Sequence, residues 1–279
     1  GFIGSPLVEA LALRGATVRA FIRYNSRGDV WLLNDIDPEI YESLDIYFGD
    51  LKDPVAVRQA MAETETVFHL GALIGIPYSY LNPYDVAQTN LMGTLNVLTA
   101  ARSMDLRRII QTSTSEVYGS AQYVPIDEDH PLQGQSPYSA GKIGADKLAE
   151  SFHLSFGLPV STVRPFNTYG PRQSMRAVIP TMIVQALTQD KIKLGALYPR
   201  RDFTYVADTV SGFVAAAESD GSVGEVVNLG VGKDISIGEL AQLVLELTGR
   251  DIPIESESAR LRPEASEVKR LISNNSKAK

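Results

Sequence analysis

Residues 1–22, GFIGSPLVEALALRGATVRAFI, place a glycine-containing turn, a helix-like segment and a strand-like segment in succession. Ser5 is a candidate helix cap, and Pro6 suits the first turn of a helix, where its missing N–H has no partner to lose. Apolar residues at helical spacing predict a helix over about residues 5–14. The apolar run at 18–22 predicts a buried strand directly after it.

The same alternation of strand and helix continues along the chain. Its members are strands at 46–48, 66–70, 108–112 and 160–163 and helices at 55–61, 82–102 and 138–156. Because the predicted strands are apolar on both faces, we expect an α/β fold with a doubly wound parallel sheet of the Rossmann type, covered by helices on both sides.

The alternation fades after about residue 167, where prolines interrupt shorter elements. We therefore expect residues 1–166 to form the Rossmann domain and residues 167–279 to form mainly a smaller mixed subdomain. A strand-like run at 226–229 predicts that residues of about 203–232 return to the Rossmann domain.

The composition of the 279 residues is that of a globular protein, with 44% hydrophobic and 21% charged side chains. The chain has no cysteine, which excludes disulfides, thiolate catalysis and zinc–thiolate sites. His69, His130 and His153 show no ligand spacing, so we expect no metal site. No apolar run approaches the ~20 residues that cross a bilayer, and no signal peptide is visible, so we expect a cytoplasmic protein without a membrane partner.

The formal net charge of −7 argues against nucleic acid as a partner, because duplex-binding surfaces are basic. Residues 158–210 depart from this balance, with seven basic and three acidic side chains. A basic segment in an acidic chain suits an anionic small molecule, although a solvated helix face would have the same composition.

Gly1-Phe2-Ile3-Gly4 matches the last two glycines of a G-x-x-G-x-x-G turn, whose backbone N–H groups hold a pyrophosphate at a helix N-terminus. Alone, such a pattern is more often a tight turn than a nucleotide site. The sequence begins within this turn and without Met, so we expect an N-terminal segment that ends in the first glycine of the pattern. A sheet without the strand of that segment would have a gap in its middle.

Tyr138 and Lys142 are spaced as Y-x-x-x-K on a predicted helix, which puts both on one face. The ammonium of Lys142 near the phenol would lower the pKa of Tyr138 and make it a usable general base. By itself the pair is also compatible with a surface contact. Upstream, Thr114 follows a buried strand, at the position where parallel sheets present reactive side chains, and could share a substrate proton with Tyr138.

These features together resemble the extended short-chain dehydrogenase/reductase superfamily, in particular its NAD(P)-dependent nucleotide-sugar epimerases and dehydratases. The resemblance covers essentially the whole chain. Beyond the glycine turn and the Tyr138–Lys142 pair, it rests on Gly49-Asp50-Leu51, His69-Leu70-Gly71-Ala72, Thr89-Asn90, the segment 113–119, Arg164-Pro165-Phe166-Asn167, the segment 201–208, Asn228-Leu229-Gly230 and Arg262-Pro263.

The resemblance implies a role for each matching residue. Catalysis is assigned to Thr114, Glu116, Tyr138 and Lys142. Binding of a tightly held NAD or NADP is assigned to Gly1, Phe2, Ile3, Gly4, Arg23, Asp50, Leu51, Leu70, Gly71, Ala72, Thr89, Tyr138, Lys142 and Pro165. Binding of a nucleotide-diphospho-sugar substrate is assigned to Ser115, Asn167, Arg201 and Arg262. For Asp202 and Asp208 we expect structural roles as caps or ion-pair partners.

The choice between NAD and NADP depends on the end of the strand at 18–22. NAD enzymes carry an acidic residue there that binds the ribose, but this chain has Arg23. A guanidinium can pair with a 2′-phosphate, which favours NADP, whereas Asn25 or Ser26 could equally hold a ribose hydroxyl.

Glu116 favours a 4,6-dehydratase, because the resemblance places it as a second base beside Tyr138. In the implied reaction, Tyr138 takes the proton of the sugar 4-OH while a hydride passes from C4 to the cofactor. Glu116 then removes the C5 proton, water leaves from C6, and the hydride returns to C6 to give a 4-keto-6-deoxy sugar. Ser115 stands where dTDP-glucose dehydratases carry an Asp, so Glu116 would serve as both base and acid.

Three alternatives stay open. The Thr-Ser-Glu segment also occurs in uronate decarboxylases, a 4-epimerase would share the oxidation step, and a cofactor-sensing protein would keep the fold without the chemistry. The stretches 76–80, 123–128 and 164–173 are most similar to 4,6-dehydratases that act on UDP- or GDP-linked N-acetylglucosamine in legionaminic acid biosynthesis.

Apolar residues beyond one stripe occur on the predicted helices at about 84–102 and 138–156. Members of the family pair these helices into a four-helix bundle, so we expect a homodimer. The examples are Leu91, Leu95, Leu98, Ile143, Leu148 and Phe152, which could instead all pack on the sheet.

Overall fold

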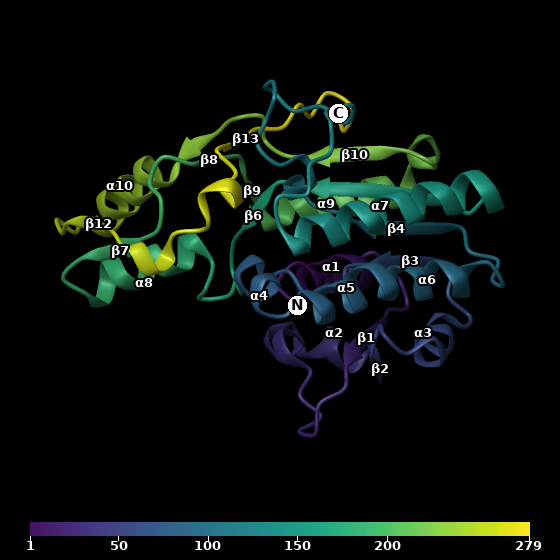
Figure 1. The fold of residues 1–279 in the computed structure, drawn as a ribbon. Helices are drawn as coiled ribbons and strands as arrows, with labels where there is room; N and C mark the ends of the chain where they lie inside the picture. Colours follow the sequence, from purple (N-terminus) through teal and green to yellow (C-terminus); the bar gives the residue numbers. More distant parts are fainter.

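Six parallel strands form the centre of the computed structural model, which describes residues 1–279 (Figure 1). They are β1 (Arg19–Arg23), β2 (Asp45–Gly49), β3 (Thr66–His69), β4 (Arg108–Thr112), β5 (Val160–Pro165) and β10 (Val226–Leu229). The order of one sheet is β10-β5-β4-β3, and β1 pairs with β2. Every pair is parallel. The strands predicted from the sequence are therefore confirmed, with ends that differ by one or two residues at most.

Helices cover both faces of these strands. Ile109 of β4 packs in one core with α3 (Pro54–Met61), α6 (Gly93–Ala101) and α7 (Pro137–Phe156). The next residue, Ile110, faces the other way, into a core with α1 (Gly4–Ala12) and α9 (Val206–Glu218). Because side chains alternate between the faces of a strand, one apolar strand supplies both cores. The expected doubly wound parallel α/β fold is confirmed.

The sheet is interrupted between β1 and β3, which do not pair with each other. Residues of both strands, together with α1, line one cavity.

The helix α7 has strong local signals at both ends. Ser136 caps its first turn, accepting a hydrogen bond from the N–H of Ser139, while the Ser139 hydroxyl accepts one from the N–H of Ser136. Pro137 occupies the first helical position, and Gly157 ends the helix in the left-handed conformation. These caps fix the start of the helix and with it the position of Tyr138, the second helical residue.

The single helix predicted at 82–102 is wrong in detail. The segment consists of α5 (Pro83–Ala87), a wide π-helical turn at 88–92, and α6. Asn90, inside that turn, accepts a hydrogen bond from the N–H of Leu73 at 2.7 Å and donates one to its carbonyl at 2.9 Å. The extra residue in the turn points a polar side chain at the loop after β3, which helical periodicity alone does not reveal.

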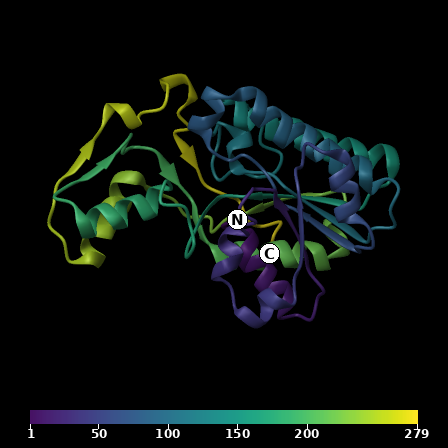
Figure 2. The same cartoon turned by 90° about the horizontal axis from the view of Figure 1, so that it is seen from below.

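Most of the remaining elements build a smaller body beside the sheet (Figures 1 and 2). Its core lies between α8 (Val178–Thr188), α10 (Ile237–Thr248) and the strands β7 (Ile192–Leu194) and β12 (Ile254–Ser256). The short strands are β6 (Asn167–Tyr169), β8 (Arg200–Arg201), β9 (Phe203–Tyr205), β11 (Ile235–Ser236) and β13 (Arg270–Leu271). Two short helices, α2 (Pro38–Glu42) and α4 (Ile76–Leu81), lie nearer the main sheet. β8 pairs antiparallel to β11 and parallel to β13, so this body is mixed, as expected.

Asp202, between β8 and β9, ties three segments together. Its buried carboxylate accepts hydrogen bonds from the N–H groups of Val231 and Gly232, and from the N–H and hydroxyl of Ser273, at 2.7 to 3.1 Å. The loop after β10 and the C-terminal segment therefore meet at one side chain. Asp208 is exposed in the first turn of α9.

Replacing Asp202 with Ala should strongly destabilise the fold. The substitution leaves three backbone N–H groups without their acceptor, and each buried unpaired group costs about 1–3 kcal/mol. We expect the free energy of unfolding, measured by urea titration, to fall by at least about 3 kcal/mol. Asp208→Ala is the matched control and should cost no more than about 1 kcal/mol. Similar losses in the two variants would contradict the structural role of Asp202.

Candidate active site

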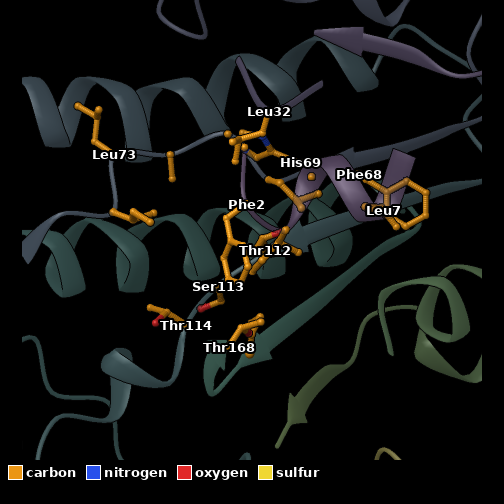
Figure 3. A pocket seen from close by; sticks show the side chains of 18 of the residues that line it. Phe2, Leu7, Leu32, Phe68, His69, Leu73, Thr112, Ser113, Thr114 and Thr168 are labelled. Atoms are coloured by element: carbon orange, nitrogen blue, oxygen red, sulfur yellow. The ribbon is translucent and has the colours of Figure 1, made fainter. Parts of the chain in front are cut away.

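A cavity of about 1700 Å³ opens at the carboxyl ends of β3, β4 and β5 and extends to the smaller body and along α1. Nearly all the site residues predicted from the sequence line it. They are Gly1, Phe2, Ile3, Gly4, Arg23, Asp50, Leu51, Leu70, Gly71, Ala72, Thr89, Thr114, Glu116, Tyr138, Lys142, Pro165, Asn167, Arg201 and Arg262. Ser115 is the exception, because its side chain is buried outside the cavity lining. Figure 3 shows Phe2 and the strand-end residues Thr112, Ser113 and Thr114 around this pocket.

The N-terminus of α1 suits an anionic group. The first N–H groups of a helix have no partner within the helix, and its dipole favours negative charge there. Gly1 and Gly4 both line the cavity, and a Cβ on either would meet no atom within 4 Å. The open approach to the backbone therefore fits the pyrophosphate of a dinucleotide.

Tyr138 and Lys142 lie one helical turn apart on α7 and are both buried. Burial raises the pKa of Tyr138 well above its usual value, and the nearby Thr114 hydroxyl acts in the opposite direction. The lowered pKa expected from Lys142 is therefore not found. The Lys142 Nζ instead donates to the carbonyl oxygen of Thr112 at 2.5 Å, and loss of solvation decides the pKa of the phenol.

Burial lowers the pKa of Lys142 to about 8, although the negative charge of Asp146 acts to raise it. The side chain is therefore charged at neutral pH and loses its proton under mildly alkaline conditions. The same burial, together with the positive charge of Lys142, lowers the pKa of His69 to about 3, so that this imidazole is neutral. His69 Nε2 lies 3.1 Å from the hydroxyl of Thr94.

Thr114 and Glu116 are placed by a tight turn at the end of β4. The Thr114 hydroxyl accepts a hydrogen bond from the N–H of Glu116 at 3.2 Å and so caps a 3₁₀ turn over 115–118. Gly119 ends the turn with a φ of 63°, and a Cβ there would lie 2.9 Å from the carbonyl oxygen of Gln133. The turn directs the Glu116 carboxylate to a place where its charge acts on the Tyr138 phenol.

Two arginines from the smaller body complete the other wall of the cavity. Arg201 is buried and lies 3.4 Å from the carboxylate of Glu267. Arg262 lies 4.0 Å from Glu116, and its buried Nη1 has no hydrogen-bond partner. The Oδ1 of Asn167 is likewise buried without a partner. The two guanidinium groups can donate to a ligand with several oxygen atoms, which fits a diphosphate, whereas the Asn167 Oδ1 is an acceptor and suits a hydroxyl or N–H of a ligand.

The end of β1 contributes Arg23, which is largely exposed and has its Nε 3.9 Å from the Asp50 carboxylate. Asn25 is not free to hold a ribose, because its amide group forms hydrogen bonds with the backbone of Arg27 and Asp29. The Asn25 side chain, one of the two polar alternatives to Arg23, is therefore occupied by hydrogen bonds within the turn.

Two further residues near these groups, Asp146 and Glu267, were not predicted from the sequence. Asp146 follows Lys142 by four positions, so its place on the same helix face could have been predicted from the spacing. Glu267 gives no such signal, because only the return of the C-terminal segment brings it to Arg201. No group of three or more His, Cys, Asp or Glu side chains is arranged to hold a metal ion. None of the helices combines the length and apolar character needed to span a membrane.

Replacing Arg262 with Gln should weaken diphosphate binding. Because a charge-assisted hydrogen bond contributes about 1.5–3 kcal/mol, the dissociation constant of UDP in calorimetry should rise at least about tenfold. Arg250→Gln removes an exposed guanidinium of the same body and should leave binding unchanged. Equal affinities in the two variants would show that Arg262 does not take part.

The chain is similar in sequence to enzymes that act on nucleotide sugars. A family model described as GDP-mannose 4,6 dehydratase matches residues 1–279. A dTDP-glucose 4,6-dehydratase of Streptomyces griseus is 38% identical over 204 residues, which cover 73% of this chain and 62% of that protein. A UDP-glucuronate 4-epimerase of Thermodesulfobacterium geofontis is 33% identical over 260 residues, which cover 90% of this chain and 79% of that protein.

The fold is also similar to solved structures. UDP-glucuronic acid 4-epimerase from Bacillus cereus, in complex with UDP-glucuronic acid and NAD, has a TM-score of 0.88 and 27% identity; the match covers 100% of this chain and 88% of that one. The match to the family model extends over the whole sequence, and the relatives are nucleotide-sugar dehydratases and epimerases. The chain therefore belongs to the GDP-mannose 4,6-dehydratase family of nucleotide-sugar-modifying enzymes.

Proposed function

We propose that this protein is a nucleotide-sugar 4,6-dehydratase that converts its substrate to a 4-keto-6-deoxy sugar. The observation that carries the proposal is the Glu116 carboxylate, which shares a cavity with Tyr138 and Thr114 and whose charge acts on the Tyr138 phenol. A second base beside the tyrosine allows a second proton to be moved, which C4 oxidation alone does not need. The dTDP-glucose 4,6-dehydratase among the relatives supports the same reaction.

Each catalytic residue has a place in the reaction. Tyr138 takes the proton of the sugar 4-OH as its phenolate, a form that the nearby Thr114 hydroxyl favours and that burial disfavours. A bound nicotinamide cofactor supplies the acceptor and donor of hydride. Glu116 removes the C5 proton and passes it to the C6 hydroxyl, which leaves as water. When hydride returns to C6, C5 takes up a proton, which balances the one lost from the 4-OH. Because burial opposes the ionisation of Tyr138, the phenol must give up its own proton before it can take that of the sugar 4-OH.

The substrate is held by its diphosphate. Arg201 and Arg262 supply the positive charge and Asn167 an amide, while Arg262 also lies within reach of Glu116. We propose a nucleotide-linked N-acetylglucosamine as the sugar, on the resemblance of the sequence to the legionaminic acid type. Ser115 is buried and would act on the substrate only through the turn that it shares with Glu116.

We also propose a homodimer formed by α6 and α7. Leu98 belongs to the main core, and the partly buried Leu148 and Phe152 pack against that core. These three side chains therefore face the sheet. Exposed apolar side chains on and beside these helices include Leu154 and Phe156 of α7 and Met92 before α6. Leu98 is buried in the core and is therefore not available for a contact between two copies. The cytoplasmic location stays a prediction.

Replacing Glu116 with Gln should separate the two halves of the reaction. Oxidation at C4 should persist, because Tyr138, Lys142 and Thr114 are unchanged, while loss of water should stop. Mass spectrometry should then show no product 18 mass units lighter than UDP-N-acetylglucosamine, GDP-mannose or dTDP-glucose, and absorbance near 340 nm should show reduced cofactor. The exposed Glu264→Gln is the matched control. Full dehydration by Glu116→Gln would refute the proposal, and a product of unchanged mass from the unmodified protein would indicate epimerisation.

The Arg23 guanidinium provides the test of the cofactor. We propose that it pairs with a 2′-phosphate and so favours NADP, although NAD is the cofactor in the epimerase structure described above. Arg23→Ala should raise the dissociation constant of NADP about tenfold or more and leave that of NAD unchanged. Arg27→Ala, in the same exposed turn, is the control. Much tighter binding of NAD than of NADP by the unmodified protein would overturn the preference.

A further inference from the structure

The same face of α7 that carries Tyr138 and Lys142 carries a third buried residue. Asp146 follows Lys142 by one helical turn, and all three side chains are at most 6% exposed. A buried carboxylate is costly unless it is paired and hydrogen-bonded. The partners of the Asp146 carboxylate therefore indicate its role.

Asp146 is paired through a single oxygen atom. Its Oδ2 accepts hydrogen bonds from the Ser113 hydroxyl at 2.7 Å and from Nε of Arg164 at 3.1 Å, and it forms an ion pair with Nη2 of Arg164 at 3.0 Å. Its Oδ1 is buried and has no partner. The carboxylate thus lies between the helix, the residue that precedes Thr114, and β5.

Arg164 continues the network away from the cavity. Its Nη1 donates to the Tyr118 hydroxyl at 2.9 Å, and that hydroxyl donates to Oδ1 of Asn228 at 2.7 Å. The backbone N–H of Asn228 in turn donates to the Glu128 carboxylate at 2.8 Å. Ser113, Tyr118, Arg164 and Asn228 all lie in motifs that matched the family in sequence but received no role there. The fold brings them together around Asp146.

We propose that Asp146 is a positioning residue that holds Lys142 in its charged form and Ser113 in place, and that Arg164 keeps Asp146 ionised. The inference rests on the proposed function, because it assigns to Lys142 the support of Tyr138. Without the carboxylate, a buried ammonium with one carbonyl partner would lose its proton more readily. Without the guanidinium, a buried carboxyl would take up a proton and stop acting on Lys142.

The pKa values agree with this arrangement. Burial lowers the pKa of Lys142, and Asp146 is the group that opposes the effect. Burial raises the pKa of Asp146, and Arg164 opposes that effect. The other titratable groups around Lys142 are Tyr138 on α7, the neutral His69 of β3, Glu116 from the turn after β4, and Arg164 of β5. Of the two carboxylates, only Asp146 acts on the Lys142 pKa.

The direction in which Asp146 variants should shift the titration of Lys142 follows from these charges. In the intact protein Lys142 is charged below a pKa of about 8 and neutral above it. Asp146→Asn removes the charge that raises this pKa, so the midpoint should move to lower pH by about one unit or more. The alkaline limit of kcat should move downward with it. Asp146→Glu keeps the charge and should restore most of the original midpoint.

The test is the titration of Lys142 in protein labelled with ¹³C at the lysine Cε, with the signal assigned from its loss in Lys142→Arg. Glu150→Gln, an exposed carboxylate one turn further along α7, is the control and should leave the midpoint unchanged. If Asp146→Asn does not fold because Arg164 loses its partner, the double variant Asp146→Asn with Arg164→Gln is titrated in its place, since it removes both charges. A lowered midpoint in either variant supports the proposal.

An unchanged Lys142 midpoint in a folded Asp146 variant would overturn the proposal. This readout needs no substrate, so it is independent of the reaction. If no tested nucleotide sugar loses water, the proposed function fails while the titration still decides the role of Asp146. If dehydration occurs and the midpoint does not move, the proposed function stands and the role of Asp146 fails.

Discussion

Parallel pairing of β3, β4 and β5 is the constraint on which the site depends. Parallel strands bring their carboxyl ends to the same edge, so Leu70 to Ala72, Ser113 to Glu116 and Pro165 to Asn167 meet although they are far apart in sequence. Helices connect each strand to the next, so the edge at the carboxyl ends of the strands stays free. A change of register in one pair would separate the hydroxyl of Thr114 from the residues of β5 that flank it.

The helix α7 adds chemistry to this edge at an electrostatic cost. Tyr138, Lys142 and Asp146 lie buried on one face, and burial disfavours the charged form of each. The structure offsets this cost with fixed partners: the Thr112 carbonyl for Lys142, and Ser113 with Arg164 for Asp146. The partners come from β4 and β5, so the sheet that positions the reactive groups also sets their protonation.

The smaller body supplies the opposite wall. Arg201 and Arg262 approach from it, and each has a carboxylate nearby, Glu267 and Glu116 respectively. Their arrangement depends on the return of the C-terminal segment, which Asp202 fastens by its four hydrogen bonds to Val231, Gly232 and Ser273. The positions of the two arginines and the stability of the fold therefore both depend on the buried contacts of Asp202.

The sequence by itself determined the parallel α/β class, the strands and the Tyr138–Lys142 pair, because periodicity and spacing along one element are local properties. It did not reveal the π-helical turn at Asn90 or the burial of Ser115, since both depend on neighbours distant in sequence. The pKa of Tyr138 was predicted with the wrong sign for the same reason. Solvent exclusion by the whole fold outweighs a charge one turn away, and only the tertiary structure decides how much water a side chain keeps.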